Sequence, residues 1–187
     1  MSRIDTQAEI DRMAELYRQP EPASRDEHLR TPPFSSDAEQ AVLGGLMMAP
    51  EALWRVADLL GPEDFYRRDH QEIYRAICEL AEKRKPYDAV TVGDWFAAQD
   101  RAEMVEGGAY LVQLATGTHS AANIGAYAEI VRDKALQRRL IEVGTEIVNA
   151  GFDPSAEPDQ ALASAQTLVQ GLMPKQRGSG HESRRPA

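Results

Sequence analysis

The stretch SAANIGAYAEIVRDKALQRRLIEVGTEIVNAG, residues 120–151, decides the fold of this chain. Its apolar residues recur every three or four positions, a spacing typical of one face of an α-helix. In the second half they are separated by four, three and four residues, as in a coiled-coil seam: Leu136, Leu140, Val143 and Ile147. We expect a single helix that is capped by Ser120 or Asn123 and ends at Gly151. About 27 helical residues would span about 40 Å.

A second helix is expected directly after the first. Asp153-Pro154 turns the chain, and Pro158 suits the first turn of a helix. The apolar residues of this helix again fall on one side: Leu162, Ala165, Leu168, Val169 and Leu172. The pair predicts an antiparallel helical hairpin. Because two helices alone cannot cover both of their apolar faces, we expect the hairpin to pack against another subunit.

The residues before the hairpin predict a globular helical head. Ser36 and Glu39 form a capping box that opens a helix through Met48, and Gly44-Gly45 inside it indicates that another backbone comes close. Pro50 suits the first turn of the next helix, whose expected inward residues are Leu53, Val56, Ala57 and Leu60.

Three further features complete the expected head. A turn that buries Phe65 precedes a helix over residues 69–83, and Thr91 caps a short helix. Gly107-Gly108 forms a turn before one more apolar segment. Alternation of β-branched residues is nearly absent. The fold class is therefore all-α, with a head over residues 31–120 followed by the hairpin over residues 121–173.

The two ends of the chain differ in composition from the part between them. Residues 1–30 combine a candidate helix over residues 4–18 with a linker rich in proline and charge. That helix is either a tethered arm or a docking segment. Residues 174–187 are rich in glycine, serine and basic residues, and we expect them to be a disordered tail.

Composition bounds the function of this 187-residue chain. A net charge of −9 disfavours direct nucleic-acid binding, because DNA phosphates attract basic proteins. The lone Cys78 cannot form an internal disulfide or a multi-cysteine zinc site. The sequence holds neither an apolar run long enough to cross a membrane nor an apolar signal core. We expect a soluble, cytoplasmic protein.

A search for catalytic chemistry finds no convincing site. No P-loop is present, and the glycine pairs follow no strand of the dinucleotide-binding kind. The histidines are scattered; His70 is expected to precede a helix and to make local hydrogen bonds or face solvent. The carboxylates Glu63, Asp64 and Asp69 fit helix capping better than acid–base catalysis. We therefore predict no enzyme activity, no cofactor and no metal.

One polar cluster suggests a partner. Four basic residues gather on about two turns of the long helix: Arg132, Lys134, Arg138 and Arg139. Such a stripe could meet an acidic surface on a neighbour. It also fits ordinary solvation of the outer face of the hairpin, and the sequence leaves both interpretations open.

Six stretches, in order, resemble the N-terminal domain of DnaB-type replicative DNA helicases. The first is TPPFSSDAEQAVLGGLM, residues 31–47. The others are Asp64-Phe65-Tyr66 with His70 and Ile73-Tyr74, Asp88 with Thr91, Gly107-Gly108 with Tyr110-Leu111, Ser120 to Asn123-Ile124, and Tyr127 to Arg132. The resemblance covers about residues 31–172, and Ala38-Glu39-Gln40 within it is expected to determine the fold rather than contact a partner.

The resemblance implies a non-catalytic module for oligomerisation and docking in the primosome. In that family the hairpins pair between subunits, the domains form a trimer of dimers, and primase docks on this collar; helicase loaders contact the family as well. The ATPase domain of the family, with its P-loop, is not among these 187 residues, and we expect either a fragment of a full helicase or a stand-alone homologue. The hairpin residues expected to meet another subunit, chosen by periodicity, are Leu136, Leu140, Val143, Ile147, Leu162, Leu168 and Leu172.

Two alternatives keep a similar fold. A stand-alone homologue could join or inhibit another replicative helicase as a decoy or adaptor. The helicase-binding domain of a primase also has a helical head and hairpin, although the opening stretch at residues 31–47 favours the helicase side.

Overall fold

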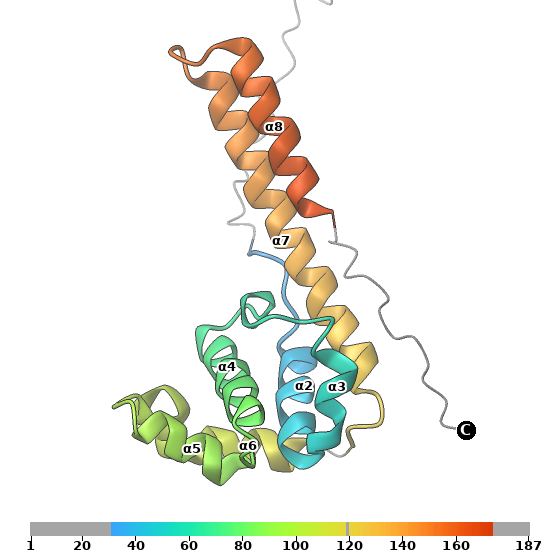
Figure 1. Cartoon of the computed structure of the whole chain (residues 1–187), viewed down its shortest axis with the longest axis vertical. Helices are drawn as coiled ribbons and strands as arrows, with labels where there is room; N and C mark the ends of the chain where they lie inside the picture. Colours follow the sequence, from blue (N-terminus) through green and yellow to red (C-terminus); the bar gives the residue numbers. More distant parts are fainter. Residues whose placement is uncertain (1–30, 119, 174–187) are drawn as a thin grey trace, which may run out of the picture. The chain divides into compact units, whose positions relative to one another are not determined.

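The computed structural model of the chain describes residues 31–118 and 120–173. The expected N-terminal helix and C-terminal tail lie outside these residues. Every regular element in the described part is helical, which confirms the all-α prediction. Figure 1 shows a head from which a long hairpin projects. The elements are α2 (Ser36–Met48), η1 (Pro50–Ala52), α3 (Leu53–Val56), η2 (Pro62–Asp64), α4 (Arg68–Glu82), α5 (Ala89–Ala97), η3 (Ala102–Gly108), α6 (Ala109–Gly117), α7 (Ile124–Phe152) and α8 (Pro158–Leu172).

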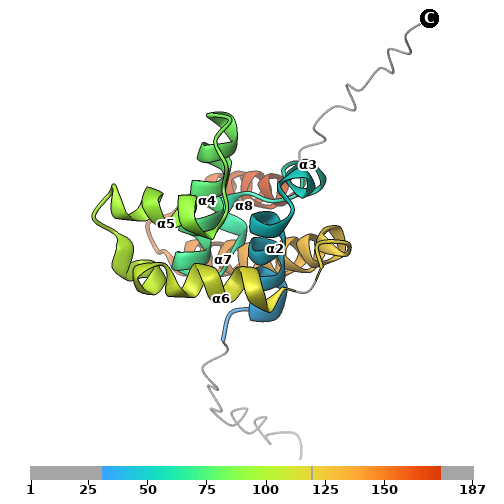
Figure 2. The ribbon, with the colours of Figure 1, turned by 90° about the horizontal axis from the view of Figure 1, so that it is seen from below.

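Helix α2 lies at the centre of the head. It packs against α4, α6 and the first turns of α7, and Figure 2 shows it among these helices from below. Val42, Leu43 and Leu46 are fully buried in the core. The expected close approach at Gly44 is confirmed, because a Cβ there would overlap the Leu114 carbonyl oxygen and the Thr118 hydroxyl.

A buried polar network joins three helices of the head. The Glu39 carboxylate of α2 accepts a hydrogen bond from the Tyr66 N–H at 2.8 Å, and it lies 2.6 Å from His70 Nδ1 of α4. His70 Nε2 lies 2.6 Å from the Tyr110 hydroxyl of α6. His70 is thus fully buried inside α4, within the helix expected over residues 69–83. The expectation that it precedes a helix is wrong, and its side chain neither bonds locally nor faces solvent.

Several predicted helix ends are wrong by one to three residues. Ser35, not Ser36, caps α2, because Ser35 is extended and its hydroxyl accepts from the Ala38 N–H. Asp88, not Thr91, caps α5, because its carboxylate accepts from the N–H groups of Val90 and Thr91 at 2.9 Å. Glycine does not stop α7, which continues through Gly151 to Phe152.

The segment after Pro50 differs from its prediction, whereas the turn at Gly107-Gly108 agrees with it. The chain after Pro50 starts as a 3-10 turn, which shifts the helical phase, so Ala52 is buried and Ala57 is exposed. The Gly107-Gly108 turn is confirmed, since both glycines adopt left-handed backbone angles. In the described part of the chain, no helix combines the length and apolar character needed to cross a membrane.

Candidate interaction surface on the helical hairpin

Helix α7 changes its surroundings along its length. Its buried residues follow each other at helical spacing, Ile124, Ala128, Val131 and Ala135, and pack against the head. Beyond Ala135 none of its residues is buried. The first turns of α7 therefore belong to the core, and the remainder projects as one arm of the hairpin, which Figure 1 shows beside α8.

The inner seam of the hairpin is made by residues that α7 and α8 turn toward each other. Val143 and Ile147 of α7 are half-buried, as are Ala165, Leu168 and Leu172 of α8. Alanine on α8 lets the two helices approach closely. Four of the seven predicted interface residues (Val143, Ile147, Leu168 and Leu172) are thus partly covered within one chain.

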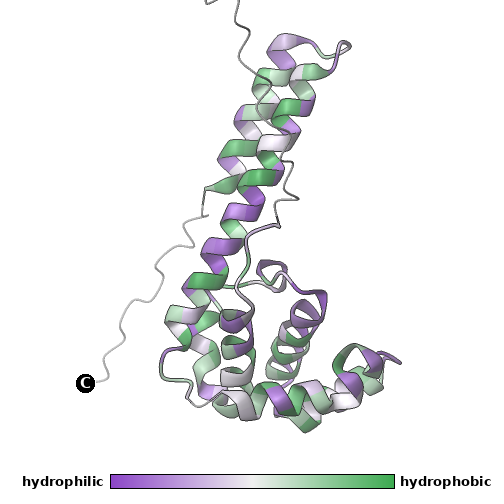
Figure 3. Cartoon of the chain, turned by 180° about the vertical axis from the view of Figure 1, so that it is seen from behind, coloured by the Kyte–Doolittle hydropathy of each residue, from purple (hydrophilic) through white to green (hydrophobic). Residues whose placement is uncertain are grey.

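The other three predicted interface residues remain open to solvent. Leu136 is 43% exposed, Leu140 is 59% exposed and Leu162 is 61% exposed. Large apolar side chains that are this exposed and gather on one element indicate a surface that binds a partner. Figure 3 shows apolar ribbon along both arms of the hairpin.

A second apolar line on α7 was missed by the sequence reasoning. Ile141, Val148 and Phe152 are separated by seven and four residues, so they share one side of the helix, and each is more than half exposed. The same three-to-four spacing that identified the inner seam could have found this line. Leu136 and Leu140 share the side of α7 that carries the inner seam, whereas the second line lies on another side of the helix. We define the outer apolar surface of the hairpin as the exposed apolar residues of both arms, on more than one side: Leu136, Leu140, Ile141, Val148, Phe152, Leu162 and Val169.

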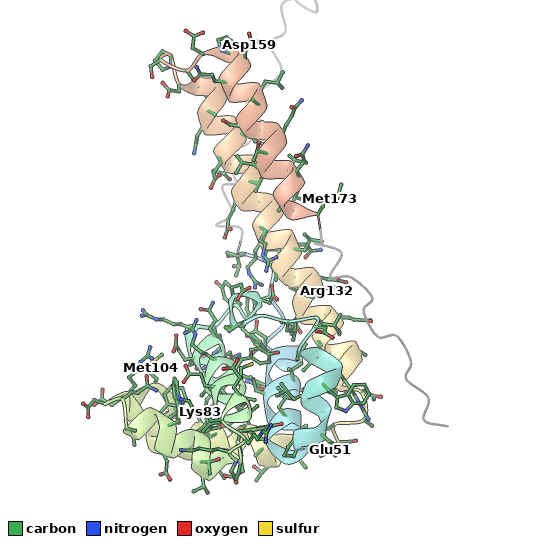
Figure 4. All side chains as sticks on the ribbon, viewed as in Figure 1. Glu51, Lys83, Met104, Arg132, Asp159 and Met173 are labelled. Carbon is green, nitrogen blue, oxygen red and sulfur yellow. The ribbon has the colours of Figure 1, made fainter. Side chains whose placement is uncertain are left out.

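The four basic residues of α7 do not form one solvated stripe. Arg132, labelled in Figure 4, is exposed and lies 3.3 Å from the Asp133 carboxylate, and Lys134 Nζ lies 3.4 Å from the Gln137 side-chain oxygen. Arg138 and Arg139 instead contact the head, where Asp64 accepts from both. Sequence reasoning missed this role because Asp64 is more than 70 residues away along the chain.

The carboxylates considered for catalysis act as structural acceptors. Asp64 accepts from the Gly61 N–H at 2.8 Å, and Asp69 accepts from the His70 N–H and pairs with Arg67. Burial raises the pKa of Asp64, although the Gly61 N–H and Arg139 oppose this effect. The capping interpretation is confirmed for Asp64, which closes the turn at Gly61, whereas Asp69 lies in the first turn of α4 and does not cap it.

Cys78 is half-buried in α4, and burial raises the pKa of its thiol, which makes it a weak nucleophile near neutral pH. Within the described residues, no three histidine, cysteine or acidic side chains are grouped so that they could hold a metal ion. The feature best suited to function is therefore the outer apolar surface of the hairpin.

Comparisons with known proteins match this architecture. A family model described as the DnaB-like helicase N-terminal domain matches residues 31–133. The chain is 41% identical over 140 residues to the replicative DNA helicase DnaC of Bacillus subtilis and to DnaB of Geobacillus stearothermophilus. These matches cover 75% of this chain and 31% of each relative, so the chain spans about a third of their length.

Solved structures give the same result. The N-terminal domain of DnaB helicase from Mycobacterium tuberculosis is similar with a TM-score of 0.72 and 38% identity, over 75% of this chain and 99% of that one. A structure described as a DnaB-like replicative helicase and its interactions with primase shares the fold, with a TM-score of 0.62 and 22% identity. That match covers 76% of this chain and 32% of the other.

Proposed function

This chain belongs to the DnaB-like helicase N-terminal domain family, and we propose that it is a non-catalytic oligomerisation and docking module of a replicative helicase. The full relatives are replicative DNA helicases. In this proposal the hairpin pairs with a second copy, dimers assemble further, and the ATP-driven work of unwinding belongs to other parts of the helicase. As a replication protein it would act in the cytoplasm.

The outer apolar surface of the hairpin carries this proposal. Covering one large aliphatic side chain contributes about 1.5–3 kcal/mol, and the surface holds several such side chains on two adjacent helices. The cost of association, about 4–15 kcal/mol, must be offset by this burial. A second copy offers a matching surface, since a two-fold symmetric contact pairs the same residues from both chains.

Self-association can be tested by light scattering at micromolar concentration. Leu140→Glu and Leu162→Glu place charges on the outer apolar surface without disturbing a buried residue, so both should shift the protein toward the monomer. Thr167→Glu is the matched control, because Thr167 is exposed on α8, five residues from Leu162, and its neighbours three and four positions away lie outside the outer apolar surface. A wild type that stays monomeric, or a control that dissociates equally, would contradict the proposal.

Primase is the proposed docking partner, with a helicase loader as the second. The support is the shared fold with a helicase whose solved structure concerns interactions with primase. Arg132 and Lys134 are the basic residues of α7 that do not bind the head, so they are the better candidates to meet an acidic partner surface.

The docking proposal is tested by binding of the cognate primase to the assembled wild type. Arg132→Glu with Lys134→Glu should weaken binding and reduce its salt dependence, while light scattering shows that assembly persists. Arg68→Glu with Lys85→Glu, at two exposed cations of the head, is the control with the same change of charge. Equal primase binding by all three proteins would show that Arg132 and Lys134 lie outside the docking site. If the assembled wild type does not bind primase, primase is not the partner.

A further inference from the structure

The neck of α7, defined as residues 136–140, is the least supported part of the hairpin. Ala135 is the last α7 residue buried in the head, and Val143 is the first that is half-buried against α8. Between them Leu136 and Leu140 are exposed. Figure 1 shows α7 leaving the head as a single helix below the end of α8, so the direction of the hairpin depends on what else holds the neck.

Two arginines of the neck bind the head. Arg138 donates to the Pro33 carbonyl oxygen at 2.8 Å and to the Asp64 carbonyl oxygen, and its guanidinium lies 5.7 Å from the centre of the Tyr66 ring. Arg139 pairs with the Asp64 carboxylate. We call this set (Pro33, Asp64, Tyr66, Arg138 and Arg139) the clasp. It joins the start of the head, the turn after α3 and the neck.

Further contacts within the head fix the position of the clasp residues Asp64 and Tyr66. Asp64 is only 5% exposed, and its second carboxylate oxygen accepts from the Gly61 N–H. The Tyr66 ring stacks on Phe34 with 4.5 Å between ring centres. The Tyr66 N–H donates to the buried Glu39, so the clasp connects directly to the polar network of the core.

We propose that the clasp sets the direction of the hairpin relative to the head, with Asp64 and Arg138 as the positioning residues. The inference rests on the proposed function, because a fixed direction presents the outer apolar surface of the hairpin in one geometry for assembly. A guanidinium can hold two carbonyl oxygens at once through its forked N–H groups, which a flexible ammonium cannot do in the same way. The nearly buried Asp64 carboxylate in turn needs its cation, since removal of one partner leaves a charge without compensation.

The direction of the hairpin can be measured within one chain by electron paramagnetic resonance. Spin labels are attached through Lys83→Cys in the head and Asp159→Cys at the far end of the hairpin, two positions labelled in Figure 4, in a Cys78→Ala background. Mixing with excess unlabelled chain removes distances between copies. The wild-type clasp should give one narrow distance distribution.

Three variants test the clasp, and a fourth variant is the matched control. Asp64→Asn, Arg138→Met and Arg138→Lys should each at least double the width of the distribution. Glu63→Gln removes the same charge from the exposed neighbouring residue and should leave the width unchanged. Unaltered widths in both Arg138 variants would overturn the proposal. Circular dichroism checks folding, and if Asp64→Asn fails to fold, the half-buried Arg138 supplies the test.

The consequence for assembly is measured separately. A hairpin without a fixed direction loses orientational freedom when it binds, so Arg138→Met should weaken self-association about tenfold. A broad distribution together with unchanged self-association would overturn the role of the clasp in assembly. A wild type that does not associate at all would instead contradict the proposed function, while the distance measurement would still decide whether the clasp orients the hairpin.

Discussion

At the residue scale, Glu39 shows how much of the head depends on a single buried carboxylate. Its two oxygens bind partners 27 and 31 positions away along the chain, and it is itself almost completely buried. Every member of the network has a partner when the His70 Nδ1–H donates to Glu39 and Nε2 accepts from the Tyr110 hydroxyl, which in turn accepts from Gln40 at 3.4 Å.

Removing this carboxylate should destabilise the head strongly. Glu39→Ala leaves the Tyr66 N–H and His70 buried without their acceptor, so we expect the free energy of unfolding to fall by about 3 kcal/mol. Urea denaturation followed by circular dichroism measures it. Glu51→Ala, at an exposed carboxylate of the head, should change the value by less than about 0.5 kcal/mol. Similar losses of stability in both variants would show that the buried polar network contributes no more than an exposed carboxylate.

Asp88 offers a test that depends on pH. The N–H groups of Thr91 and Val90 hold the pKa of its carboxyl below the usual range. Because the folded-state pKa is the lower one, the cap stabilises the protein above the unfolded pKa of about 3.9, and this contribution is lost as the pH falls through the folded-state value.

We expect the difference in stability between the wild type and Asp88→Ala to become smaller at acidic pH. Asp88→Ala should lower the free energy of unfolding by about 1 kcal/mol at pH 7 and by progressively less below about pH 4. Asp94→Ala, at an exposed position of the same helix, should have little effect at either pH. An Asp88→Ala loss that stays constant into acid would contradict the role of the ionised cap.

At the element scale, helical spacing predicts most of the architecture but not the caps. The burial of Ile73, Tyr74, Ile77 and Leu80 in α4 follows from periodicity alone. Caps depend instead on the backbone angles of one residue, so Ser35 and Asp88 could not be chosen over their neighbours from residue type. The partners of Arg138 and Arg139 could not be predicted either, because the contact joins segments that are distant along the chain.

Two glycines on different helices should respond in opposite ways to the same substitution. Gly44→Ala in α2 forces a methyl group against the Leu114 carbonyl, so it should lower the free energy of unfolding by several kcal/mol despite better helix propensity. Gly125→Ala in α7 meets open space and should raise it by up to about 1 kcal/mol. Thermal unfolding of both variants measures the contrast, and a stabilised Gly44→Ala would mean that α2 and α6 can move apart at no cost.

At the scale of the whole molecule, the described part of the chain divides its apolar side chains between two uses. Those of the head are buried in a core that one chain completes, and those of the outer apolar surface of the hairpin remain exposed. The sequence predicted this division, because the hairpin has more apolar faces than its two helices can cover. The sequence could not predict which apolar residues of the hairpin stay exposed to solvent, because this depends on where α8 ends along α7.

The proposed assembly through the hairpin should therefore carry the thermodynamic signature of apolar burial. We expect calorimetric dilution of the assembled wild type at several temperatures to give a negative heat-capacity change for association. Raising the salt concentration should weaken association little, because the outer apolar surface of the hairpin carries no charge. Leu140→Glu should reduce the heat of dilution, whereas Thr167→Glu should preserve it. A heat-capacity change near zero with strong weakening by salt would assign assembly to the basic residues of α7 instead of its leucines.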